Sequence, residues 1–293
     1  MNRVDTGDAL RGAVAAARSA GRRIGLVPTM GHVHEGHLSL VDRALEASDF
    51  VVVTVFVNPL QFGPGEDFAR YPRDPERDTQ LFAARGAHLL FAPSEVEMYP
   101  TGEPAVFVVA PALADRLCGA FRPGLFQGVL TVVAKLFNRV TPDVAVFGRK
   151  DFQQLVLIRR MVRDLDFTIE ILEGDVVREP DGLALSSRNG YLDAEARGQA
   201  ALLRRSLLAA QESFDKGETS AAALIASARY VLELGPLVRP QYIELVDAVT
   251  LDPVARARPG NVLAVAAHVG KTRLIDNHVL AAPRRGFETD ARG

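Results

Sequence analysis

The sequence predicts an α/β fold, with a Rossmann-like doubly wound parallel sheet followed by a smaller C-terminal α+β domain. Strand-length apolar runs alternate with helical patterns through the first half of the chain. The run "FVVVTVFVN" (50–58) is rich in β-branched residues, as is typical of a parallel strand buried on both faces. Beyond about residue 178 the pattern changes to alanine- and leucine-rich helices followed by antiparallel strands.

The helices of the first half follow from apolar spacing and end signals. Leu38, Val41 and Leu45 recur at a helical period, and Gly86 closes a helix that begins near "DPERD". The apolar run "AVFVV" (105–109) follows the third expected strand. The expected helices cover about residues 7–20, 35–46, 74–86, 126–140 and 152–164, and the expected strands cover 23–29, 50–58, 88–93, 143–148 and 167–172.

The second half is expected to form a separate domain. Residues 193–235 are helical in pattern, and "QYIELVDAVTL" and "NVLAVAAHVGKTRLIDNHVL" indicate antiparallel strands with a turn near "RPGN". We therefore expect a nucleotide- and acid-binding domain over residues 1–177 and a smaller lid domain over 178–283. The end of the chain, residues 284–293, is expected to be a flexible tail.

Composition narrows the function classes. The chain has 293 residues, of which 48% are hydrophobic and 24% charged, with a net charge of −2. Such a balance gives no reason to expect nucleic acid binding, which usually needs a basic surface. No apolar run is long enough to span a membrane, so no membrane association is expected. The single cysteine, Cys118, fits a reducing compartment, and we expect a cytoplasmic protein.

Three motifs resemble known signatures without meeting them. "HEGH" lacks the spacing of the zinc-protease signature; His34 and His37 could still share a helix face toward a metal, but no third ligand is evident. "VAAHVGKT" resembles a P-loop, but Val265 occupies the first glycine position and a strand fits its surroundings better. "LSSRN" has no nucleophile elbow, so a serine hydrolase is unsupported.

Three loops at the predicted carboxyl ends of strands carry the polar residues: "PTMGHVHEGH", "NPLQFG" and "GRKDFQQ". Ligands of open parallel sheets bind at that edge. A glycine-flanked turn that opens a helix can present free N–H groups to phosphate, and histidines in the first turn can add donors. Lys150 and the hydroxyls and guanidinium of "LSSR" would complete a site for an ATP polyphosphate.

The sequence resembles the pantothenate synthetase family over nearly its whole length. The matching stretches are "PTMGHVHEGHLSLV", "VFVNPLQFGPGEDFARYPRD", "GVLTVVAKLFNRVTPDVAVFGRKDFQQLVLIRRMV" and "VREPDGLALSSRNGYL". In that nucleotidyltransferase superfamily "HEGH" corresponds to the HIGH-type motif and "SSRN" to the KMSKS loop. The resemblance implies ATP-dependent condensation of (R)-pantoate with β-alanine through pantoyl adenylate, with Mg²⁺, in a homodimer.

The resemblance also implies roles for individual residues. His37, His34 and Lys150 would be catalytic, with His37 as proton donor, although adenylylation of a carboxylate needs no proton transfer and charge stabilisation should dominate. A protonated histidine would help the leaving pyrophosphate by its charge. The ATP-binding set would be Met30, Gly31, His32, Val33, His34, Glu35, Gly36, His37, Gly148, Arg149, Lys150, Asp151, Val177, Leu185, Ser186, Ser187 and Arg188.

For the other substrates, Gln61 and Gln154 would bind pantoate, and Gln61 would also lie near β-alanine. Weaker candidates near the substrates or metal are Asn58, Tyr71, Asp78 and Arg122, and the ligands of the metal and the base for the β-alanine amine remain unassigned.

The sequence departs from the usual family pattern at four positions. Arg149 replaces a common glutamate and adds positive charge beside the nucleotide segment, and Leu125 replaces a histidine. Leu185 replaces a methionine, and His32 replaces a small or amide residue. These departures keep two alternatives open: a degenerate nucleotide-binding homologue without ligase activity, and a related nucleotidyltransferase that acts on a phosphorylated acceptor.

Overall fold

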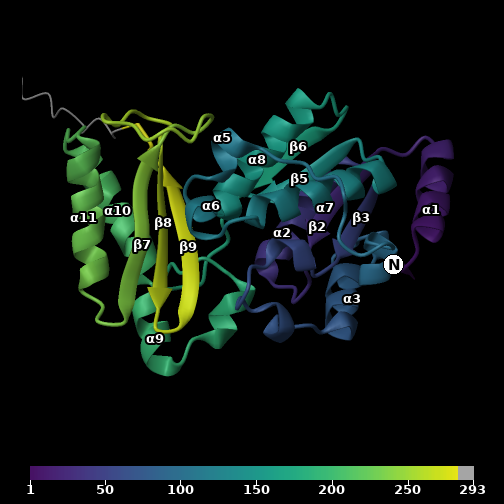
Figure 1. The fold of residues 1–293 in the computed structure, drawn as a ribbon, viewed down its shortest axis with the longest axis horizontal. Coiled ribbons are helices and arrows are strands. Elements are labelled where there is room, and N and C mark those ends of the chain that lie inside the picture. Colours follow the sequence, from purple (N-terminus) through teal and green to yellow (C-terminus); the bar gives the residue numbers. More distant parts are fainter. Residues whose placement is uncertain (283–293) are drawn as a thin grey trace, which may run out of the picture. The chain divides into compact units, whose positions relative to one another are not determined.

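The computed structural model describes residues 1–282, whose contacts form two compact units (Figure 1). The first unit comprises Met1–Arg178 and Leu185–Ser187. The second comprises Glu179–Ala184 and the chain from Arg188 onward. The expected tail at 284–293 lies outside the described residues.

The first unit is built on a six-stranded sheet in which every neighbouring pair is parallel. The strand order is β1-β4-β3-β2-β5-β6, so β3 and β4 lie on one side of β2 while β5 and β6 lie on the other. The junction of β2 and β5 is therefore the topological switch point, where open sheets bind ligands. The strands are β1 (Asn2–Val4), β2 (Ile24–Thr29), β3 (Phe50–Val55), β4 (Leu89–Phe91), β5 (Val144–Gly148) and β6 (Glu170–Gly174).

Helices cover both faces of this sheet. Val27, Val53 and Val146 form one core with α2 and α3, while the alternate residues of these strands face α1, α7 and α8. Burial on both faces explains why the strands read as continuous apolar runs. The helices are α1 (Gly7–Ser19), α2 (Glu35–Ala47), α3 (Pro75–Ala84), α4 (Glu95–Met98), α5 (Pro111–Ala114), α6 (Cys118–Phe121), α7 (Leu125–Val140) and α8 (Phe152–Asp164).

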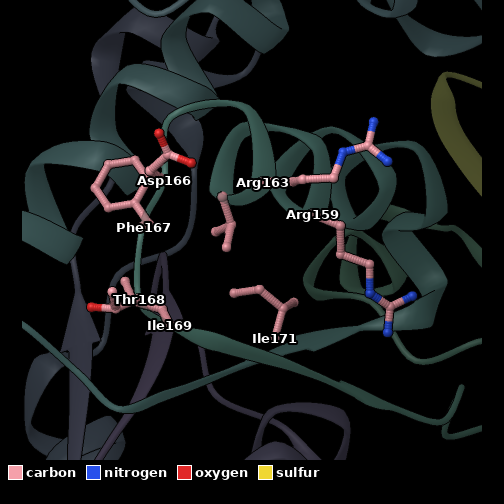
Figure 2. Close-up of a pocket in the computed structure, with 8 residues that line it drawn as sticks. Arg159, Arg163, Asp166, Phe167, Thr168, Ile169 and Ile171 are labelled. Carbon is pink, nitrogen blue, oxygen red and sulfur yellow. The ribbon is translucent and has the colours of Figure 1, made fainter.

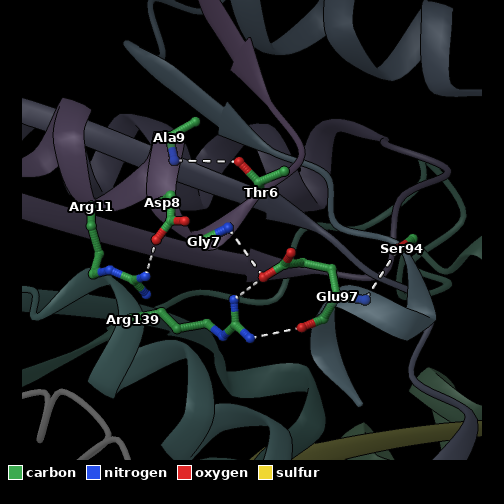
Figure 3. A network of polar contacts seen from close by, with 8 residues as sticks. All are labelled: Thr6, Gly7, Asp8, Ala9, Arg11, Ser94, Glu97 and Arg139. Carbon is green, nitrogen blue, oxygen red and sulfur yellow. Dashed lines mark hydrogen bonds and ion pairs between the residues drawn. The ribbon is translucent and has the colours of Figure 1, made fainter. Parts of the chain in front are cut away.

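A polar network joins the start of α1 to α4 and α7 (Figure 3). The Glu97 carboxylate accepts from the Gly7 backbone N–H at 3.1 Å and from Arg139 Nη1 at 2.6 Å. Arg139 Nη2 also donates to the Glu97 carbonyl at 2.7 Å. The hydrogen bond from Arg139 is the main reason that the pKa of Glu97 lies below its ordinary value. This network fixes the last turn of α7, whose first turns lie beside the site described below.

The second unit packs three helices on a three-stranded antiparallel sheet of order β7-β8-β9. β8 is buried almost throughout, and Leu263, Val265 and Ala267 contribute to a core with Leu207 and Leu224 of the helices. The elements are α9 (Ala194–Ala200), α10 (Leu202–Asp215), α11 (Ala221–Glu233), β7 (Val238–Val246), β8 (Val262–Val269) and β9 (Thr272–Val279).

The α/β architecture and most elements are as the sequence predicts. The P-loop look-alike ends β8 and forms its hairpin with β9, where Gly270 adopts φ +58°, so the strand interpretation is confirmed. The run 105–109 adds no strand to either sheet among residues 1–282. β3 ends at Val55 rather than residue 58, and the short edge strand β1 was not expected.

Candidate active site

The loop that follows β2 turns sharply through two left-handed residues. Gly31 has φ +81° and His32 has φ +50°. A β-carbon on Gly31 would lie 2.8 Å from Asp78 Oδ2, so the position requires glycine for both conformation and space. The turn reverses the chain between β2 and α2 and delivers His34 to the start of α2 at the switch point.

His34 and His37 cap α2 together. His34 Nδ1 accepts from the Gly36 backbone N–H at 3.1 Å, and His37 Nδ1 accepts from the His34 N–H at 3.4 Å. Both rings therefore carry their proton on Nε2 when neutral. Within residues 1–282 neither Nε2 has a hydrogen-bond partner. The pair thus offers two N–H donors beside the positive end of a helix dipole.

Both imidazoles are neutral at pH 7. Burial lowers the pKa of His34 to about 4, and the positive charge of Lys150 adds to the effect. Burial is also the main cause that keeps the pKa of His37 well below 6.5, followed by the charges of His34 and Lys150. A positively charged imidazole, which would help pyrophosphate to leave, is therefore not the state of the free protein. Lys150 follows β5, which pairs with β2, so the loops of Lys150 and of the two histidines leave the carboxyl ends of neighbouring strands.

Most backbone N–H groups of the loop between β2 and α2 already donate hydrogen bonds within the protein. The sequence alone predicts that these groups are free for phosphate. Thr29 Oγ1 accepts from the Gly31 N–H at 3.1 Å, and the Asp78 carboxylate accepts from those of His32 and Val33. The capping contacts use the N–H groups of His34 and Gly36. Within residues 1–282, the side-chain donors and the Glu35 backbone N–H are thus left for an anion.

The second segment follows β5. Arg149–Asp151 form a short 3₁₀ turn (η3) that places Lys150 next to Asp151, with 4.0 Å between Nζ and Oδ2. Arg149 forms an ion pair with Glu173 and lies 3.0 Å from Asp175 Oδ1. The extra positive charge at this position is therefore balanced by carboxylates at the end of β6.

The third segment of the site, residues 185–187, contacts the loop after β2 through Ser187. Its Oγ donates to the His32 carbonyl at 3.3 Å, and the Leu185 N–H donates to the Val177 carbonyl at 3.0 Å. Both Ser187 and Leu185 belong to the first unit by their contacts, whereas Arg188 belongs to the second. Residues 30–37, 148–151, 177 and 185–187 are thus joined within one unit.

Gln61 lies beside the loop after β2, held by a short 3₁₀ turn, η1 (Pro59–Gln61). Its Nε2 lies 2.7 Å from Met30 Sδ, and its Oε1 accepts from Asn58 Nδ2 at 3.2 Å. Asn58 is 1% exposed and also accepts from the Tyr99 hydroxyl at 2.8 Å and donates to the Gly128 carbonyl at 3.1 Å. The buried Asn58 therefore holds the Gln61 side chain in place through the hydrogen bond to its Oε1.

Gly128 of α7 is a further residue of this region that sequence reasoning missed. A β-carbon there would collide with the Leu60 carbonyl and lie 2.8 Å from the Gln61 backbone nitrogen. Its signal in the sequence is only a glycine inside an otherwise strongly helical pattern, which often marks close backbone approach. The close packing of α7 on η1 depends on it.

The two adjacent glutamines of α8 differ in their contacts. Gln153 is buried; its Oε1 accepts from the Cys118 N–H at 3.0 Å, and its Nε2 donates to the carbonyls of Leu113 and Arg116. The partly buried Gln154 amide makes no hydrogen bond within the described chain. An amide with unused donors and acceptors one turn beyond η3 suits a polar ligand.

The remaining weaker candidates have structural contacts. Arg122 is paired with Glu66, with 2.6 Å between Nε and Oε1, and also donates to the Gln61 carbonyl at 3.2 Å. Tyr71 is buried, with its ring edge-on to Phe62 at 5.8 Å between centroids. Arg122 therefore lies next to Gln61, but its charge is already compensated by a carboxylate.

A pocket elsewhere in the unit is separate from these segments (Figure 2). It is formed by the end of α8 and the start of β6, and is lined by Arg159, Arg163, Phe167, Ile169 and Ile171 among others. That is the amino end of β6, whereas the loops above follow the carboxyl ends of β2 and β5. Across residues 1–282 no group of three potential ligands could hold a metal, and no helix has the length and apolarity to cross a bilayer.

Comparison with known proteins agrees with this arrangement. The profile of the Pantoate-beta-alanine ligase family matches residues 2–279. The pantothenate synthetase of Moorella thermoacetica is 52% identical over 280 residues, which cover 96% of this chain and 99% of that protein.

Solved structures extend the match to three dimensions. Pantothenate synthetase from Thermus thermophilus superposes with a TM-score of 0.92 at 48% identity, covering 96% of this chain and all of the other. The pantoate-beta-alanine ligase of Francisella tularensis, solved with beta-gamma ATP and beta-alanine, gives a TM-score of 0.79 at 31% identity, with 97% of this chain covered and 100% of that one. Matched along its length in sequence and in fold, the chain belongs to the pantoate–β-alanine ligase family.

Proposed function

We propose that this protein condenses (R)-pantoate with β-alanine to form pantothenate, consuming ATP and releasing AMP and pyrophosphate. The observation that carries the proposal is the meeting of His34, His37 and Lys150 at the β2–β5 switch point, in a chain of this family. Ligation at that edge requires a nucleotide site and an acid site side by side. The histidines and Lys150 are proposed to form the first, and Gln61 of η1 and Gln154 of α8 the second.

ATP would bind through side-chain donors. The Nε2–H groups of His34 and His37 are neutral donors that suit phosphate oxygens, and the ammonium of Lys150 supplies charge. The N-terminus of α2, a helix of 13 residues, adds its positive dipole end. Gly148, Val177 and the segment 185–187, all of the first unit, are proposed to line the rest of the nucleotide.

The first step would form pantoyl adenylate. A carboxylate oxygen of pantoate attacks the α-phosphorus of ATP, and the bond to the bridging oxygen breaks so that pyrophosphate leaves with the electron pair. No proton is transferred in this exchange. Lys150 is proposed to stabilise the charge that builds on the phosphoryl oxygens, and the two histidines to orient them, so positioning and electrostatics carry the catalysis.

The second step would be acyl transfer. The neutral amine of β-alanine attacks the acyl carbon of the adenylate, AMP leaves with the electron pair of the acyl–oxygen bond, and the new amide nitrogen loses a proton. Nδ1 of each histidine already accepts a backbone N–H and Nε2 carries the ring proton, so neither imidazole offers a free lone pair to the amine in this state.

Pantoate is proposed to bind between Gln61 and Gln154, and β-alanine near Gln61. The Gln154 amide has donors and acceptors to spare within the described residues, and an amide can pair with both the hydroxyls and the carboxylate of pantoate. Arg122 lies against the backbone of Gln61, so an incoming carboxylate there would compete with Glu66 for the guanidinium.

Magnesium is proposed to arrive as the ATP complex rather than as a resident metal. The two carboxylates of this region do not form a set of metal ligands. Asp78 accepts hydrogen bonds from backbone N–H groups, and Asp151 is exposed beside Lys150. Mg²⁺ commonly keeps its waters and binds phosphate oxygens with few protein ligands. The Asp151 carboxylate lies 4.0 Å from the Lys150 ammonium.

We further propose that the protein is a cytoplasmic homodimer. The cellular assignment is supported by the single cysteine, Cys118, which is buried and in no disulfide. The dimer is carried over from the family resemblance. Sedimentation velocity at micromolar concentration would test it, and a mass of one chain across the range would reject it.

One assay separates the proposed activity from its alternatives. Purified protein is given ATP and Mg²⁺ with pantoate, with β-alanine, or with both, and AMP and pantothenate are measured. We expect pantothenate only with both acids. ATP binding without AMP release would favour the degenerate homologue, and nucleotidyl transfer to a phosphorylated acceptor but not to pantoate would favour the related transferase.

A further inference from the structure

Asp78 lies beneath the loop that follows β2 and is bound to its backbone. The residue belongs to α3 and is 1% exposed. Its Oδ2 accepts from the His32 N–H at 2.8 Å, and its Oδ1 accepts from the Val33 N–H at 2.7 Å. We propose that Asp78 is a positioning residue for ATP: it fills the turn at residues 31–33 and thereby sets the location of His34 and His37. This inference rests on the proposed function.

The turn has the form of an anion-binding nest. Successive N–H groups converge where a left-handed residue is followed by one of ordinary handedness, and such concavities commonly take phosphate. Here His32 has φ +50°, which a non-glycine residue adopts only when its surroundings hold it there. The Asp78 carboxylate occupies the concavity from inside the protein. The chain therefore provides its own anion for this nest.

The carbonyl side of the same turn is also held. Arg77 Nη1 donates to the Val33 carbonyl at 2.9 Å, and Ser187 Oγ donates to the His32 carbonyl at 3.3 Å. Arg77 and Asp78 are neighbours on α3, so one helix fixes both faces of the turn. Ser187 then ties the segment 185–187 to a turn whose shape Asp78 has already set.

The geometry distinguishes this role from direct contact with a substrate or metal. Both carboxylate oxygens are engaged by the loop, and the side chain is sealed from the surface. A ligand could reach them only by displacing the turn. The consequence for ATP is indirect: when the turn moves, the cap of α2 moves with it, and so do the two Nε2–H donors.

The test compares Asp78→Asn with Glu76→Gln. Asparagine keeps the size of the side chain but turns one acceptor into an NH₂ group that faces a backbone N–H. Glu76 is an exposed carboxylate on the same helix turn and serves as the matched control. Binding is measured calorimetrically with ATP and Mg²⁺ in the absence of pantoate, and the amide ¹H–¹⁵N signals of His32 and Val33 are followed by NMR.

For Asp78→Asn we expect ATP to bind about tenfold more weakly or worse, since charge-assisted hydrogen bonds that fix the turn are lost. The amide signals of residues 32–34 should shift, and the KM for ATP should rise while the KM for β-alanine stays close to wild type. Glu76→Gln should match wild type throughout. A folded Asp78→Asn protein with ATP affinity within twofold of wild type, or with unmoved amides, would overturn the proposal.

A second variant covers the case in which Asp78→Asn does not fold. Gly31→Ala leaves the carboxylate in place but puts a methyl group 2.8 Å from Asp78 Oδ2 at a residue with φ +81°. We expect the same loss of ATP affinity and the same amide shifts, and wild-type behaviour would contradict the inference. Because ATP binding is measured without pantoate, a wild-type protein that binds ATP but makes no pantothenate would refute the proposed function alone.

Discussion

The imidazole rings of His34 and His37 stack on each other, with 4.1 Å between their centroids and 29° between their planes. Each ring accepts a backbone N–H through Nδ1, so the two are locked in one tautomer at the start of α2. A cation in either ring would repel its neighbour and nearby Lys150. The stack therefore exists as a neutral pair of donors.

This pairing predicts an unusual titration. In the free protein we expect His34 to titrate near pH 4 and to remain neutral at pH 6, as followed by ¹H–¹³C NMR of the ring. Bound ATP brings negative charge and should raise the pKa of His34. A midpoint near 6.5 in the free protein would contradict the burial argument.

The same shift has a consequence for stability. Above pH 6.5 His34 is neutral in both the folded and unfolded chain. Between pH 6.5 and about 4 the unfolded chain binds the proton more readily, so the free energy of unfolding falls as the pH falls. In the His34→Gln variant, we expect the free energy of unfolding, measured in urea, to fall less steeply between pH 6.5 and 4 than in the wild type. The same slope in both proteins would count against the prediction.

Lys150 is expected to act on the rate rather than on the fold. Lys150→Ala should lower the single-turnover rate of pantoyl adenylate formation by about 10²–10³-fold, the range for loss of one preorganised charge at a transition state. The far-UV spectrum and melting temperature should stay close to wild type. Lys216→Ala, at an exposed position after α10, is the control. An unchanged single-turnover rate would remove Lys150 from the mechanism.

Arg149 is expected to matter through its carboxylate partners. Arg149→Glu would bring three acidic groups together at the ends of β5 and β6, so we expect lower stability and weaker ATP binding. The double variant Arg149→Glu/Glu173→Arg reverses the ion pair. It should restore part of the lost stability and part of the lost ATP affinity. If the double variant is no better than Arg149→Glu alone in calorimetric binding and thermal melting, the ion pair is not what holds η3.

Gly128 offers a test of how the acid site is supported. Gly128→Ala forces α7 and η1 apart, which should cost about 1–3 kcal/mol in the free energy of unfolding and raise the KM for pantoate. Gly198→Ala on α9 meets nothing within 4 Å and should be neutral or stabilising by about 0.5–1 kcal/mol. Equal effects of the two substitutions in denaturant unfolding would show that the close approach at Gly128 is tolerated.

The sequence predicted the parallel sheet and the position of its loops because both follow from local pattern. Leu38, Val41 and the β-branched run that became β3 carry their period in the chain itself. The convergence of "HEGH" and "GRKD" followed from the rule for strand ends.

The inner support of the site could not be predicted in the same way. The bonds from Asp78 to His32 and Val33, and the approach of Gly128 to Leu60, join residues far apart in sequence. The balance of Arg149 by Glu173 likewise depends on the pairing of β5 with β6. Tautomers and pKa shifts of the histidines depend on burial, which a motif does not contain.

Gln153 and Gln154 provide the sharpest comparison, because the two residues are identical and adjacent. Gln153 bridges three backbone groups near α5 and α6, and its replacement by alanine leaves buried donors and acceptors unpaired. We expect Gln153→Ala to lower the free energy of unfolding by about 1–3 kcal/mol. Gln154→Ala removes an amide that is unpaired in the described chain, so stability should hardly change while the KM for pantoate rises. Urea unfolding and initial-rate kinetics on both variants check the pair. Because each variant controls for the other, a large stability loss in Gln154→Ala with unchanged pantoate kinetics would place Gln154 among the structural residues and leave pantoate without its second amide.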